Sequence, residues 1–255
     1  MGRSSLCGVA TVAELTSLLA AHDLPTDLVD ELLDGMPGTL LLDEAAEVLA
    51  ADLTLCHPPL VAEEVRVQLG PEGREHTRRV TVVTHDRRGL LAATAGALAG
   101  LGLSVVAAAA ATWEDRGMAM EGVTVVDAER RQWGQSEWDR VAVEVEEVVR
   151  GTRVPSVAFR PAAPVKAVAS PVLDGNALVT VEAPDRIGLV WAIASWFEMG
   201  GYNVLAARLS DDGAGRANDA FLVDRAPDVD RLVAHLDGSE TAGSRLGRLR
   251  RRRGR

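Results

Sequence analysis

The chain has 255 residues, of which 47% are hydrophobic and 25% are charged, and this balance excludes a disordered or fibrous protein. No apolar stretch approaches the roughly 18 residues that a membrane helix needs, and the first residues lack the apolar core of a secretion signal. We therefore expect a cytoplasmic protein without membrane contact. The formal net charge of −10 argues against nucleic-acid binding by the body of the protein.

The first part of the chain has the pattern of short helices. Thr11 and Glu14 form a capping-box signature, and apolar residues follow it at helical spacing. Two more helices are predicted over Thr26–Leu33 and Leu42–Ala51. We expect residues 1–60 to form a small, mainly helical N-terminal segment.

Residues 61–153 have the pattern of a mixed helix and strand unit with an extra leading strand. Val65, Val67 and Leu69 alternate with polar residues, as in a strand with one buried face. The other elements follow from changes of the hydrophobic period between two and 3.6. They are a strand at Arg79–Thr84, a helix from Leu90 to Gly102, strands at Leu103–Thr112 and Ala119–Asp127, and a helix around Trp138–Arg150.

A Pro-rich linker follows, over residues 154–175, with four prolines and one short strand expected at Ser156–Phe159. Residues 176–238 then repeat the earlier pattern. The expected elements are a strand at Ala177–Ala183, a helix at Gly188–Met199, strands at Tyr202–Ser210 and Asn218–Asp224, and a helix at Asp228–Asp237.

The end of the chain, residues 239–255, is a basic tail. Seven arginines and no acidic residue lie between Arg245 and Arg255. We expect this tail to be disordered. The alternative is a basic arm that contacts nucleic acid, anionic lipid or the acidic surface of a neighbouring molecule.

The two mixed units are copies of one sequence. The segment from Val80 to Leu90 aligns with the segment from Leu178 to Leu189, and Asp86 falls on Asp185 at an offset of 99 residues. The copies differ where the first has Glu121 and the second has Asp219. The repeat therefore predicts two similar domains in tandem.

Each copy has a strand that feeds a helix through an Asp-Arg-x-Gly turn. The first backbone N–H groups of such a helix have no partner and attract anions, for example the carboxylate of a free amino acid. Gly89 and Gly188 leave room for a ligand, and Asp86 and Asp185 are placed to cap the helices. For one copy alone, a capped turn without a ligand is the favoured explanation. Its repetition at matching positions favours a binding role.

These motifs resemble tandem ACT domains, the βαββαβ regulatory modules of amino-acid metabolism. The turns read Asp86-Arg87-Arg88-Gly89-Leu90 and Asp185-Arg186-Ile187-Gly188-Leu189. The resemblance implies an α+β fold of two ferredoxin-like domains. It also implies an effector site in which the turn faces the start of the second strand, Ser104 or Asn203, of a neighbouring domain. The expected ligand-binding residues are Asp86, Arg87, Gly89, Leu90, Ser104, Asp185, Arg186, Gly188, Leu189 and Asn203.

The second copy is similar to the C-terminal ACT pair of the uridylyltransferase/uridylyl-removing enzyme of nitrogen control. That resemblance implies glutamine as the ligand, a role in nitrogen regulation, homodimerisation through ACT–ACT pairing and a regulated partner protein that the sequence does not identify. We expect the ligand site around Asp185, Gly188 and Asn203, and we expect Gly188→Val to abolish binding. The second copy has no evident fourth strand after its last helix, so we expect a domain that is either incomplete or completed by another segment.

The sequence does not indicate an enzyme. The five histidines are scattered, and Cys7 and Cys56 lack metal-ligand spacing, so we expect reduced thiols, no metal and no cofactor. The glycines from Gly96 to Gly102 lie within and at the end of a helix, which favours close packing over nucleotide binding. A non-catalytic amino-acid sensor is the favoured function. The alternatives are a dimerisation module with vestigial sites, and a detached regulatory end of a uridylyltransferase.

Overall fold

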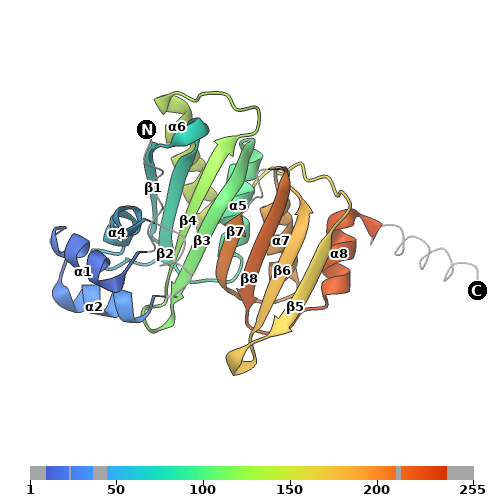
Figure 1. Cartoon of the computed structure of the whole chain (residues 1–255). Helices are drawn as coiled ribbons and strands as arrows, with labels where there is room; N and C mark the ends of the chain where they lie inside the picture. The colour runs from blue at the N-terminus through green and yellow to red at the C-terminus, as the bar shows by residue number, and fades with distance from the viewer. Residues whose placement is uncertain (1–9, 23, 37–44, 211–213, 240–255) are drawn as a thin grey trace, which may run out of the picture.

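The computed structural model describes residues 10–22, 24–36, 45–210 and 214–239 (Figure 1). Its centre is one eight-stranded antiparallel sheet with the order β1-β2-β4-β3-β7-β8-β6-β5. The strands are β1 (Val65–Glu72), β2 (Arg78–His85), β3 (Leu103–Trp113), β4 (Met118–Asp127), β5 (Lys166–Pro171), β6 (Ala177–Pro184), β7 (Val204–Ser210) and β8 (Arg216–Val223). The expected α+β class is confirmed.

The sheet has two halves with the same internal order, β1-β2-β4-β3 and β5-β6-β8-β7. The corresponding strands β3 and β7 pair in the middle, where Ala107 lies opposite Ser210 and Ala110 lies opposite Ala207. These two strands run antiparallel, so an approximate twofold axis passes between them and relates the halves. The start of β7 therefore lies near the end of β3.

The edge strand of each half precedes the rest of that half. The expected βαββαβ order places an edge strand last, whereas β1 and β5 occupy the outer positions and give the order ββαββα. An edge strand pairs with one neighbour, so either end of the segment can supply it. The strand that completes the second half is β5, within the Pro-rich linker. Residues 156–159 form no strand in the described structure, so that prediction was wrong.

Four helices form one layer on one face of the sheet. They follow the order α6-α5-α7-α8, and α5 and α7 pack against each other across the boundary between the halves. A Cβ at Gly96 would lie 2.8 Å from Cδ1 of Trp191, so this helix pair needs glycine for close packing. The helices are α5 (Leu90–Gly100), α6 (Gln135–Arg150), α7 (Leu189–Met199) and α8 (Val229–Asp237).

The N-terminal helices cover the opposite face of the first half (Figure 1). Val82 packs toward the α5 and α6 side, whereas Val83 packs under the N-terminal helices, so β2 is buried on both faces. Asp52 joins the layers: it accepts a hydrogen bond from the Thr81 hydroxyl at 2.6 Å and forms an ion pair with Arg79 at 2.7 Å. The helices are α1 (Val12–Ala20), α2 (Thr26–Asp34) and α4 (Ala46–Thr54).

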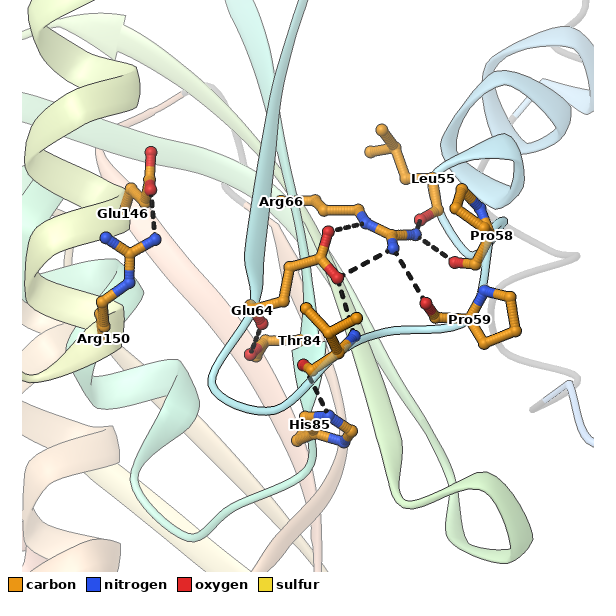
Figure 2. A network of polar contacts seen from close by, with 10 residues as sticks. Leu55, Pro58, Pro59, Glu64, Arg66, Thr84, His85, Glu146 and Arg150 are labelled. Carbon is orange, nitrogen blue, oxygen red and sulfur yellow. Dashed lines mark hydrogen bonds and ion pairs between the residues drawn. The ribbon is translucent and has the colours of Figure 1, made fainter.

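Arg66 of β1 holds the connection between the N-terminal helices and the sheet (Figure 2). Its guanidinium donates to the carbonyl oxygens of Leu55, Pro58 and Pro59 and to the Glu64 carboxylate. One arginine thus joins the end of α4 and the loop that follows it to β1.

Among the described helices, none covers the corresponding face of the second half of the sheet. Val179 and Val181 of β6 are buried, whereas Leu178 is 38% exposed and Glu182 is exposed. This alternation is typical of a sheet with one covered face.

The predicted helices and strands of both copies are otherwise present. The helix expected at Leu42–Ala51 is found as α4, and its first residues, 42–44, lie outside the described residues. Residues 240–255 of the basic tail also lie outside the described residues.

Candidate ligand site between the two halves

The two Asp-Arg-x-Gly turns have nearly the same geometry. Gly89 and Gly188 are the N-cap residues of α5 and α7, with φ of 83° and 81°. The N–H groups of Asp86 and Asp185 each donate to a glycine carbonyl at 2.8 Å. Because φ is positive at both glycines, a side chain there would strain the backbone.

The aspartates do not cap the helices as expected. Within the described chain, no side chain makes a cap hydrogen bond at the start of α5 or α7. The reason is geometric: the glycine occupies the N-cap position, and each aspartate lies three residues before it. The first N–H group of each helix already donates to a carbonyl oxygen of its own turn, Leu90 to Arg87 at 3.3 Å and Leu189 to Arg186 at 3.1 Å. The N–H groups that follow in the first turn of each helix can serve another acceptor.

A cleft lies between the first turn and the second half. One wall is the turn at Asp86–Leu90, and the other contains Glu198 of α7 with Tyr202 and Asn203, which directly precede β7. The antiparallel β3–β7 pair brings these segments together. The cleft has a volume of about 30 Å³, which suits one or two water molecules.

The Glu198 carboxylate narrows the cleft. A Cβ on Gly89 would lie 2.2 Å from Oε1 of Glu198, so the missing side chain of Gly89 is what lets this carboxylate approach the turn. Glu198 is exposed. A carboxylate of the protein therefore lies where the sequence predicts the carboxylate of a ligand.

Glu121 of β4 closes the inner end of the cleft. It is 3% exposed, and its Oε2 atom has no hydrogen-bond partner among the described residues. Burial raises its pKa to about 7, although the nearby Thr94 hydroxyl and Arg87 guanidinium act to lower it. Burial also raises the pKa of Asp86, at the mouth of the same cleft. This site can accept a hydrogen bond or a positive charge from a ligand.

Arg87 lines the cleft, but part of its guanidinium is already hydrogen-bonded within the protein. Its Nη2 atom donates to the Val149 carbonyl oxygen at the end of α6. Three acidic side chains, Asp86, Glu121 and Glu198, face this one arginine in the lining. The cleft is therefore acidic overall.

The second turn is covered by the linker between the halves. A Cβ on Gly188 would lie 2.9 Å from Cγ1 of Val157, and Phe159 lies beside it. The Arg186 guanidinium lies 5.0 Å from the centre of the Phe159 ring and donates to the Arg160 carbonyl oxygen. Arg186 thus holds the linker in place.

The structure places the predicted site residues in two groups. Asp86, Arg87, Gly89 and Leu90 lie together around the cleft, and Asn203 faces them from the second half. The remaining predicted residues belong to the covered turn, to the core or to the start of β3; they are Asp185, Arg186, Gly188, Leu189 and Ser104. The expected grouping of Asn203 with Asp185 and Gly188 is not found, because the twofold arrangement pairs Asn203 with the other turn.

Sequence reasoning did not select Glu121, Glu198 or Tyr202. Glu121 had a detectable signal, an acidic residue within the apolar run from Met118 to Val126. No sequence signal marked Glu198, because a single glutamate near the end of a helix is common.

We also searched the described residues for a metal site, a reactive thiol and a membrane-spanning helix. They contain no group of three or more potential metal ligands from His, Cys, Asp and Glu. Cys56 is a buried free thiol, and burial raises its pKa to about 12, so it stays protonated at neutral pH. No described helix has the length and hydropathy to cross a bilayer.

No family model and no curated protein matches this chain. Among solved structures, an aspartate kinase from Synechocystis is similar to 62% of the chain, with 14% sequence identity and a TM-score of 0.39. The matched region spans 26% of that kinase. This similarity is too weak to assign a function.

Proposed function

We propose that this protein is a non-catalytic, amino-acid-binding regulatory protein built from two ACT-type domains. One observation supports this most directly. The glycine turn of the first half, the start of β7 in the second half and the buried Glu121 carboxyl meet in one cleft. A helix start provides N–H donors for a carboxylate, and acidic side chains provide acceptors for an ammonium group.

The zwitterionic backbone of an amino acid matches these two features. Its carboxylate would replace that of Glu198 at the start of α5, and its ammonium group would be held by Asp86. The ligand must displace Glu198, since the cleft has room for only about 30 Å³. Glu198 is exposed and can turn toward solvent at small cost.

Such a ligand would bridge the two halves and thereby change how they pair. Its binding energy would favour the arrangement of β3 and β7 in which both walls contact it. A regulated partner protein would detect this change. The pairing of β3 with β7 joins the two halves of one chain, so these strands are not free to pair with a second chain. We therefore propose that a homodimer forms through other surfaces.

Glutamine is the first ligand to test, because the second copy resembles the ACT pair of the uridylyltransferase of nitrogen control. A role in amino-acid or nitrogen regulation is part of this proposal.

Isothermal titration calorimetry with each of the twenty amino acids tests the function. We expect one ligand per chain, because the linker covers the second turn. If no amino acid binds at millimolar concentration, the sensor function is refuted.

The alternative is a pairing module with a vestigial site. The resident Glu198 carboxylate and the small cleft favour it. In that case no ligand would bind, and mutations in the cleft would change only stability.

A further inference from the structure

Glu121 is a buried acid, and its Oε2 atom has no hydrogen-bond partner among the described residues although Thr94 and Arg87 lie nearby. Its side chain lies on the helix-facing side of β4, between Val82 of β2 and Ala110 of β3 in the strand register. Buried polar atoms are nearly always hydrogen-bonded, and a carboxyl group without a partner reduces stability. Because Glu121 also lines the cleft, its unpaired Oε2 atom is a candidate contact for a ligand that enters there.

The surroundings of Glu121 define what that group can be. The cleft wall nearby is made of small side chains such as Ala92, Ala110 and Ala119. A ligand side chain would have to pass between them to reach the carboxyl group once Glu198 moves out. The acceptor at the end of that path favours an N–H donor, and the acidic lining disfavours a second carboxylate.

We propose that Glu121 determines the ligand class, selecting amino acids whose side chain ends in an N–H donor, either an amide or a cationic nitrogen. This inference rests on the proposed function. It adds a role for a residue that lies outside the turn motif.

Asp219 of β8 provides a matched control within the same chain. It occupies the corresponding register position, opposite Val181, and is also 3% exposed with one oxygen that has no partner in the described structure. It lies close to Asp185 of the second turn, which the linker covers. Asp219 thus shares the burial of Glu121 without access to an open cleft.

The experiment is calorimetry on the full chain with two ligand pairs of similar shape. Glutamine is compared with glutamate, and lysine is compared with norleucine. We expect the donor-bearing member of at least one pair to bind about 10- to 100-fold more tightly, the range for a hydrogen bond to a charged group.

Three variants locate the source of this preference. Glu121→Met should remove it, Glu121→Gln should weaken it for lysine, and Asp219→Asn should leave it unchanged. Circular dichroism will show whether each variant is folded; removal of an unpaired buried acid should preserve folding.

The outcomes separate the two proposals. If all twenty amino acids fail to bind the unmodified chain, both the proposed function and this inference are refuted. If amino acids bind but glutamate and norleucine bind as tightly as their partners, or if Glu121→Met keeps the preference, the inference is refuted and the proposed function stands.

Discussion

The two turn glycines allow a sharp comparison, because they share a backbone conformation and differ in their neighbours. In Gly89→Ala and Gly188→Ala, the new side chain must adopt a left-handed conformation, which costs about 1–2 kcal/mol. For a chain of this length we expect the melting temperature to fall by about 2–8 °C in both variants. Thermal denaturation followed by circular dichroism measures this change.

Their effects on binding should differ. The methyl group of Gly89→Ala enters the cleft beside Glu198, where the ligand carboxylate is expected, so affinity should fall at least tenfold. The methyl group of Gly188→Ala meets Val157 of the linker instead, so affinity should change by less than threefold. Calorimetry with the ligand identified in the amino-acid screen tests this. Loss of binding in Gly188→Ala together with intact binding in Gly89→Ala would refute the assignment of the open site.

Three further predictions concern acidic residues. Glu198→Ala should tighten ligand binding about two- to fivefold in calorimetry, because it removes a competing carboxylate from a helix start; weaker binding would contradict this. Asp52→Ala should lower the unfolding free energy by about 3 kcal/mol in urea titration, because it leaves Arg79 buried without its ion pair; a loss below 1 kcal/mol would show that the pair is dispensable. The folded-state pKa values of Glu121 and Asp219 are raised to about 7, so the folded chain binds protons that the unfolded chain releases between about pH 4 and 7. Stability should therefore decrease as pH rises from 5 to 8, and Glu121→Gln should flatten that decrease; a rising melting temperature over this range would contradict it.

The sequence predicted the elements of both copies because their periodicity reflects local burial. In the second half, Val179 and Val181 alternate with exposed residues, and the strand is evident. In the first half, Val82 and Val83 are both buried because helices cover both faces of β2. The adjacent apolar pair Val82-Val83, which breaks the alternation of the strand, was thus a sign of the second layer of helices.

The position of the ligand site was harder to predict, because it depends on which segments meet across the twofold axis. The turn motif identified Gly89 and Gly188 as equivalent. Periodicity contains no information on whether Asn203 faces the first or the second turn. The covering of the second turn depends on Val157 and Phe159, which lie in an irregular segment without a hydrophobic period.

The turns at Gly89 and Gly188 differ in their exposure because a single linker connects the two halves of the chain. Two separate chains paired through the same strands would have two equivalent turns. Here one linker must run from the end of α6 to β5 at the far edge of the sheet. It passes α5 at Gly96 and Gly100, then the second turn at Gly188, and then α8, where the Ala162 N–H donates to the Leu236 carbonyl oxygen. This route exists on only one side of the axis, so it covers the second turn and leaves the first turn open.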